Sequence, residues 1–120
     1  MTVAGHRPER IAEEMRNEIG LMLAGELKDP RLAVPLSVSE VRISTDMRHA
    51  RVYVRIQSEP AEKQEALKGL AAAAGFVRHE LVERLQLRRA PEIVFVLDES
   101  EEYGERIEEL LRQSKPPGGR

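Results

Sequence analysis

The segment from residue 49 to residue 57 alternates strictly between apolar and polar side chains, and this pattern limits the fold more than any other part of the chain. Ala50, Val52, Val54 and Ile56 occupy one phase, whereas the other phase contains two arginines, a histidine and a tyrosine. Because successive side chains of a strand point to opposite faces, the pattern predicts a strand with one buried and one solvated face. A sheet built on such a strand needs a layer of helices on one side only.

The neighbouring residues predict the rest of the sheet. Residues 36–43 carry apolar side chains whose phase changes at Ser39-Glu40, which indicates a β-bulge. Residues 44–47 form the connecting turn, so the two strands are expected to make an antiparallel hairpin. A third strand is expected at residues 92–97, where a nearly continuous apolar run is typical of a strand buried within a sheet.

Apolar residues at helical spacing predict the helices that cover this sheet. Residues 8–27 form one amphipathic stretch, which Asp29-Pro30 ends. A second helix begins near Pro60. Gly75, which follows four alanines, predicts a kink or a tight break, and a third helix then runs to Leu85.

A final helix is predicted over residues 100–112. Its inward side is expected to consist of Tyr103, Ile107, Leu110 and Leu111. The predicted fold class is therefore α+β, with the order α-β-β-α-α-β, a three-stranded sheet, helices on one face and an additional C-terminal helix. We expect the domain to span residues 7–112, with flexible tails at 1–6 and 113–120.

The composition excludes several classes of protein. A chain of 120 residues fits one domain. It contains no apolar run long enough to cross a membrane and no secretory signal at its start, so a cytoplasmic location is expected. Cysteine is absent, which excludes disulfides and thiol catalysis.

Charge is distributed unevenly along the chain, although the net charge is only −2. Residues 42–57 contain four arginines and a single acid, whereas residues 99–109 contain six acids and one arginine. A local basic region of this kind permits contact with phosphates.

Two groups of arginines are candidates for contact with phosphates. Arg48, Arg51 and Arg55 belong to the alternating strand or its approach, and an ordinary solvated sheet face is the alternative explanation. A second group lies at the end of the predicted third helix, where basic residues also offset the helix dipole. This second group consists of Arg84, Arg88 and Arg89.

The predicted break at Gly75 is a third candidate site. If a helix begins after Ala73, Ala74 and Gly75, its first N–H groups are unpaired and favour a phosphate. Arg78 and His79 follow in the first turn and add donors. The alternative is that small residues merely allow two helices to pack closely.

The chain lacks recognisable catalytic and metal-binding patterns. It has no P-loop, no nucleophile elbow and no Gly-x-Gly-x-x-Gly, so an enzyme is not expected. Its three histidines have no ligand spacing, and no metal or other cofactor is predicted. With only two tyrosines and two phenylalanines, the chain favours recognition of phosphates and RNA shape over stacking on single-stranded bases.

Six short segments, in order, resemble the ribosome-binding factor A family. These segments are Arg7-Pro8-Glu9-Arg10-Ile11-Ala12, Lys28-Asp29-Pro30-Arg31, Val41-Arg42-Ile43-Ser44-Thr45-Asp46-Met47, His49-Ala50-Arg51-Val52-Tyr53-Val54, Ala73-Ala74-Gly75-Phe76-Val77-Arg78 and Pro91-Glu92-Ile93. The resemblance implies a single type-II K-homology-like domain. It also implies that Ala73-Ala74-Gly75 is the Ala-x-Gly kink of the family, in place of the usual Gly-x-x-Gly loop, which this chain lacks.

The resemblance further implies a function in ribosome assembly. The partners would be small-subunit rRNA and immature 30S particles, during late maturation, 16S rRNA processing and cold adaptation, with a GTPase assisting release of a monomeric factor. One alternative is an adaptor whose acidic helix 100–112 docks on a ribosomal protein or on the GTPase. Another is a K-homology module for messenger or small RNA, which the missing Gly-x-x-Gly makes less suitable.

Overall fold

The structure is a computed structural model, and residues 8–114 are described. Its elements in chain order are α1 (Pro8–Gly25), the 3-10 helix η2 (Pro30–Leu32), β1 (Leu36–Ile43), β2 (His49–Ile56), α2 (Pro60–Leu85), β3 (Glu92–Leu97) and α3 (Ser100–Ser114). Among residues 8–114, no helix is long and apolar enough to span a membrane.

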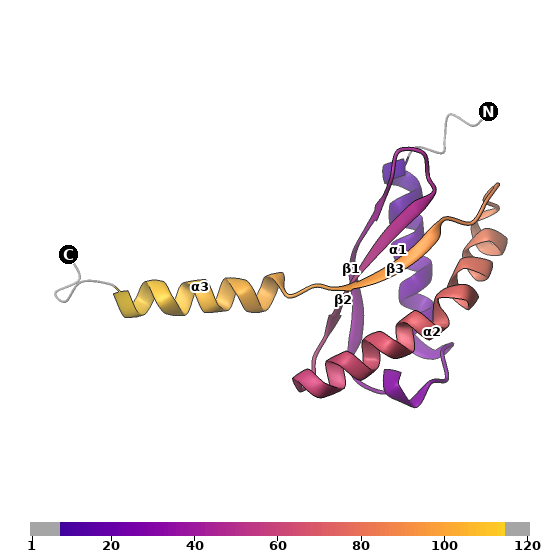
Figure 1. Ribbon diagram of the computed structural model, residues 1–120. Helices are drawn as coiled ribbons and strands as arrows, with labels where there is room; N and C mark the ends of the chain where they lie inside the picture. The colour runs from indigo at the N-terminus through magenta and orange to yellow at the C-terminus, as the bar shows by residue number, and fades with distance from the viewer. Residues whose placement is uncertain (1–7, 115–120) are drawn as a thin grey trace.

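The three strands form one sheet in the order β1-β2-β3 (Figure 1). β1 pairs antiparallel with β2, and β3 pairs parallel with β2. The register between β1 and β2 shifts between Val38 and Glu40, which confirms the predicted bulge. α1 and α2 lie together on one face of the sheet, so the predicted α+β class with one helical layer is confirmed.

The core lies between this helical layer and the sheet. Alternate β2 residues are buried, as the sequence pattern predicts, and each turn of α1 contributes one buried side chain. Burial of these apolar side chains is the main favourable term in folding. The buried side chains of α1 and β2 are Ile11, Met15, Ile19, Met22, Ala50, Val52, Val54 and Ile56.

α1 ends at Gly25, two residues earlier than predicted, and Asp29 is the N-cap of the 3-10 helix η2 that follows. The Asp29 side chain accepts a hydrogen bond from the backbone N–H of Arg31 at 2.9 Å, and its Oδ2 pairs with Arg31 Nη2 at 2.6 Å. Pro30 begins η2 directly after this cap. The ion pair between Asp29 and Arg31 therefore holds the first turn of η2 and does not itself end α1.

The predicted helix break at Gly75 is wrong, because α2 is one helix from Pro60 to Leu85. The element order is therefore α-β-β-α-β-α, although α2 bends along its course in Figure 1. A single glycine costs a helix only about 1 kcal/mol. That cost is offset here because Leu70 before the glycine and Val77 after it are both fully buried on the same face.

The strand predicted at residues 92–97 is confirmed as β3, but the prediction that it is buried within the sheet is wrong. Within residues 8–114, β3 is an edge strand that pairs with β2 alone. Its Ile93 faces the core, whereas Val94 is 50% exposed on the opposite face. A continuous apolar run therefore does not show by itself that a strand is covered on both faces.

The prediction that the last helix packs inward is also wrong. α3 extends away from the other elements in Figure 1. The residues expected to be inward are exposed, namely Tyr103, Ile107, Leu110 and Leu111. Of the expected tails, residues 1–6 and 115–120 lie outside the described part of the chain, whereas residues 113 and 114 belong to α3.

Candidate nucleic-acid interface

The face of the sheet opposite the helices is open and carries most of the predicted strand arginines. Arg51 and Arg55 are exposed there, on either side of the half-buried Tyr53. Arg42 of β1 lies opposite Arg51 in the register, and its guanidinium lies 5.5 Å from the centroid of the Tyr53 ring. The fold therefore brings a third arginine to the face that the β2 pattern identifies.

The arginines of this face differ in how far they are neutralised. Arg42 Nε donates to Glu40 at 2.8 Å, and Arg55 Nε lies 3.8 Å from Asp98 Oδ2. Among residues 8–114, Arg51 has no acidic partner within ion-pair distance. Arg51 is thus the strand arginine that is most available to an external phosphate.

Asp98 is fixed as an anion beside Arg55. The hydroxyl of Ser39 and the backbone N–H of Ser100 donate to its carboxylate, and these bonds, with Arg55 nearby, lower the pKa of Asp98 to about 2. Asp98 therefore stays charged at physiological pH and partly neutralises Arg55, which leaves less of the Arg55 charge for an external phosphate.

Arg84 is enclosed by acids and serves the fold. Its guanidinium pairs with Glu26 and Glu18 of the α1 region and with Glu80 of α2, and its side chain is 26% exposed. The hydrogen bond from Arg84 to Glu26 has the largest effect in raising the pKa of Arg84, and the hydrogen bonds to Glu18 and Glu80 raise it further. The arginine joins α2 to α1, so it has little capacity left for RNA.

Arg78 also makes internal bonds. Its Nε donates to the carbonyl of Pro91 at 3.0 Å, and its Nη2 donates to the carbonyl of Ala90 at 3.2 Å. The side chain therefore holds the loop before β3 against α2, while its residue remains exposed overall.

The three small residues at the predicted kink lie within a continuous helix. Ala73 and Ala74 are half-buried, and Gly75 and His79 are exposed. Because α2 does not break, the N–H groups after Gly75 bond within the helix and do not form a helix-start phosphate site. A Cβ on Gly75 would meet no atom within 4 Å, which leaves space for a close approach from outside.

The remaining predicted arginines meet at one end of the domain. Arg48 follows the β1–β2 turn, and Arg88 and Arg89 follow α2, yet all three line one hollow of about 660 Å³. Within residues 8–114 none of them has an acidic partner at ion-pair distance. The structure thus joins one member of the first arginine group with two of the second.

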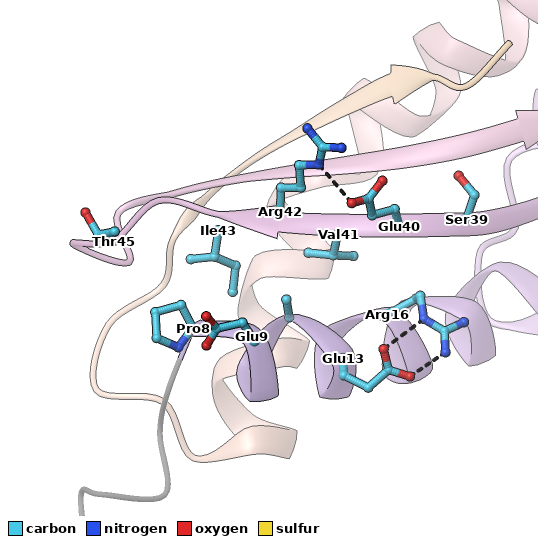
Figure 2. Close-up of a pocket in the computed structure, with 11 residues that line it drawn as sticks. Pro8, Glu9, Glu13, Arg16, Ser39, Glu40, Val41, Arg42, Ile43 and Thr45 are labelled. Carbon is cyan, nitrogen blue, oxygen red and sulfur yellow. Dashed lines mark hydrogen bonds and ion pairs between the residues drawn. The ribbon is translucent and has the colours of Figure 1, made fainter. Parts of the chain in front are cut away.

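A second hollow, of about 540 Å³, lies between α1 and β1 (Figure 2). Its charged side chains include Glu13 and Arg16 of α1 and Glu40 and Arg42 of β1. Figure 2 shows each arginine paired with the glutamate of its own element. A groove whose charges are mixed and internally paired is less suited to phosphate than the hollow lined by Arg48, Arg88 and Arg89.

Three residues of the candidate interface were not identified from the sequence as candidate site residues. Arg42 lies in the basic segment of the sequence, but its place on the open face depends on the bulge in β1. Met47 and Gln86 line the hollow beside the arginines and have left-handed backbone angles, with φ of 60° and 55°. No sequence signal indicates such angles for methionine or glutamine.

The fold and its open basic face define a K-homology-like domain without the glycine clamp. The family model for ribosome-binding factor A matches residues 7–111, and the chain belongs to this family. A ribosome-binding factor A from Caldanaerobacter subterraneus subsp. tengcongensis is 43% identical over 108 residues, which cover 90% of this chain and 88% of the relative.

Solved structures agree with this assignment. The crystal structure of ribosome-binding factor A from Thermus thermophilus matches with a TM-score of 0.67 at 27% identity, covering 77% of this chain and 97% of that one. A homology model of the Thermus thermophilus factor, fitted into a cryo-EM map of its complex with the 30S subunit, matches with a TM-score of 0.64 at 26% identity. It covers 77% of this chain and 96% of the other.

Proposed function

We propose that this protein is a non-enzymatic assembly factor that binds the rRNA of the immature 30S subunit during late maturation. In this proposal it acts in the cytoplasm as a monomer, supports 16S rRNA processing and growth in the cold, and is released with the help of a GTPase. The complex of the similar Thermus thermophilus factor with the 30S subunit supports the choice of partner.

The observation that carries the proposal is the set of arginines without internal partners. Arg51 lies on the open sheet face, and Arg48, Arg88 and Arg89 surround the hollow at one end of the domain. Phosphate contacts from lysine and arginine supply much of the affinity of proteins for nucleic acids. The proposed RNA surface therefore extends from the sheet face to this hollow, and Gly75 offers a further place where RNA can approach α2 closely.

Sedimentation with purified particles tests this function. The protein should sediment with free 30S subunits and not with 70S ribosomes. Its affinity should fall by roughly 0.7–0.9 log units per log unit of salt for each phosphate neutralised. An association that salt does not weaken would contradict phosphate recognition.

A pair of matched variants distinguishes a specific contribution of the open sheet face to binding from the general effect of losing one positive charge. Arg51→Gln removes an arginine without an internal partner, and Arg16→Gln removes one that already pairs with Glu13 on α1. Both variants lose one positive charge, but only Arg51→Gln should weaken binding to 30S subunits. Equal binding by the two variants would remove the open sheet face from the proposal.

The exposed α3 favours a second candidate function, that of an adaptor for another protein. Tyr103, Ile107 and Leu110 lie at helical spacing and are exposed, on a helix that carries five glutamates and two arginines. Such a helix suits a partner surface that is basic around an apolar groove, as on a ribosomal protein or a GTPase.

The double variant Ile107→Ser and Leu110→Ser tests the adaptor function in the full chain. If α3 docks on a protein, the variant should bind 30S subunits less well and protein-stripped rRNA unchanged. If it binds both as the original protein does, α3 has no docking function on the subunit.

A further inference from the structure

The hollow lined by Arg48, Arg88 and Arg89 combines features that a simple phosphate-binding patch does not need. We propose that it receives one unstacked nucleotide of the RNA, with the base against the apolar floor and the phosphate among the arginines. This inference rests on the proposed function and specifies which chemical group enters this end of the domain. Recognition of RNA commonly involves bases splayed out of loops and bulges and held in this way.

The position of the hollow follows from the fold. Its lining residues come from the β1–β2 turn and the end of β1, the first turn of α1 and the segment between α2 and β3. Its volume of about 660 Å³ falls within the range of about 300–1,000 Å³ that is usual for small-ligand sites. It is open to solvent, so a nucleotide attached to a chain can enter.

The polar part of the hollow is strongly basic. Three arginines line it, against one acid, Asp46. Asp46 is already engaged, because the Ser44 hydroxyl donates to it at 2.6 Å and the backbone N–H of Arg48 donates at 3.0 Å. The acid stabilises the turn and offsets part of the Arg48 charge, so three arginines against one carboxylate leave the lining with a net charge of +2.

Five of the ten residues that line the hollow are apolar, and we call them its floor: Ile11, Ile43, Met47, Leu87 and Pro91. An anion alone gains nothing from such a surface, whereas a nucleobase has an apolar face that the surface can cover. No aromatic residue lines the hollow in the described part of the chain, so stacking must come from the arginine planes and the polarizable Met47 side chain.

The backbone around the hollow is held in unfavourable angles. Met47 and Gln86 are the non-glycine residues of segment 8–114 with positive φ, at 60° and 55°, and both line this hollow. Left-handed angles are normally adopted by glycine or asparagine. Gln86 is the C-cap of α2, where such an angle is common, whereas Met47 lies in the β1–β2 turn. Residues held in such angles cluster at binding sites. The presence of methionine at such an angle fits a requirement for its side chain in the hollow.

Methionine-methyl NMR of the full-length protein tests the proposal directly. The labelled Met47 methyl group should shift on addition of each of the four nucleoside monophosphates, because a base ring lies against it. It should not shift on addition of ribose 5-phosphate or inorganic phosphate. Met15 and Met22 are fully buried in the core and serve as internal references.

Three outcomes would overturn the proposal. Equal shifts with ribose 5-phosphate would show an anion site that ignores the base. No shift with any nucleotide would show that the hollow is not a nucleotide site. Shifts with an acidic peptide but not with nucleotides would assign the hollow to a protein partner.

A variant keeps this test separate from that of the proposed function. Met47→Gly removes the side chain and relieves the positive φ; because Met47 also packs against the core, the thermal midpoint of the variant is measured first and binding is compared below it. Its dissociation constant for 30S subunits should rise about tenfold, as expected for one stacked base, whereas Thr45→Ala in the same turn should bind as the original protein does. Unchanged binding by Met47→Gly would reject the nucleotide site and leave the proposed function standing. Failure of the unchanged protein to sediment with 30S subunits would reject the function whatever the NMR result.

Discussion

Arg84 and Arg88 lie four positions apart in the sequence, but the structure gives them opposite surroundings. Arg84 pairs with three glutamates and holds α1 and α2 together. Arg88 lines the hollow and has no acidic partner among residues 8–114. A cluster of basic residues in a sequence can therefore divide into one that stabilises the fold and one that is free to bind a ligand.

The largest expected effect comes from removing the free arginines together. The triple change of Arg48, Arg88 and Arg89 to glutamine should weaken binding to 30S subunits about 100-fold or more, because three charge-assisted contacts are lost. The slope of log affinity against log salt should become shallower by roughly 2 to 3 units. Filter binding over a range of salt concentrations measures both quantities. A large fall in the thermal midpoint of the triple variant would show that these arginines stabilise the fold, and would contradict the distinction between them and Arg84.

Arg84→Met should act on the fold instead. The variant leaves Glu18, Glu26 and Glu80 close together without their cation, so its thermal midpoint should fall by several degrees. Its affinity for RNA below that midpoint should change little. Arg16→Met is the matched control, since it removes an exposed arginine with a single acidic partner and should leave the midpoint nearly unchanged.

Asp98→Asn tests the same distinction on the open sheet face, where Arg55 pairs with Asp98 and Arg51 has no acidic partner among residues 8–114. The pKa of Asp98 is lowered from an ordinary 3.8 to about 2, so its contribution to stability is present above about pH 4 and is lost as the pH falls from 4 to 2. The variant should be less stable by about 1 kcal/mol at pH 7, after allowance for solvent screening. Urea unfolding should show the difference disappearing over that acidic range.

The same variant frees Arg55 from its acid, so RNA binding at pH 7 should become modestly tighter. In the original protein, Arg51→Gln should then weaken binding more than Arg55→Gln. The opposite order would mean that the pairing with Asp98 does not limit Arg55.

The smallest effect is expected at Gln86, between the two contrasted arginines. Gln86→Gly relieves a φ of 55° and should stabilise the domain by up to about 1 kcal/mol. RNA affinity should fall slightly, because the more flexible backbone at glycine would hold the nearby Arg88 less firmly in position. Urea unfolding and RNA titration of one preparation test this exchange, and a destabilised variant would show that the Gln86 side-chain bond to the Glu83 carbonyl outweighs the backbone angle.

The hairpin, its bulge and α1 could be predicted because their signals are local. Alternation over residues 49–57 identifies the buried face of β2 without knowledge of any distant residue, and the phase change at Ser39 locates the bulge. The extent of α2 could not be predicted in the same way. Whether a helix continues through Gly75 depends on whether the residues on both sides share one buried face.

Distant contacts also explain what was not predictable in the candidate site. The function of Arg84 depends on Glu18 and Glu26, which lie 66 and 58 positions away. The hollow depends on the approach of the β1–β2 turn to the end of α2. The apolar stripe of α3 shows that a face suits burial, but not which surface covers it.

If α3 docks on a partner, its extension beyond the sheet gives the protein a second point of attachment beside the basic surface of the body. The helix has 15 residues and is therefore about 22 Å long. Asp98 and Glu99 link it to β3, and Lys63 of α2 pairs with Glu102 in its first turn at 2.6 Å. If the body and α3 each hold a large particle, the short connection keeps either one at a high local concentration while the other is bound. A competitor would then need to detach only the helix to shorten the residence time of the whole molecule.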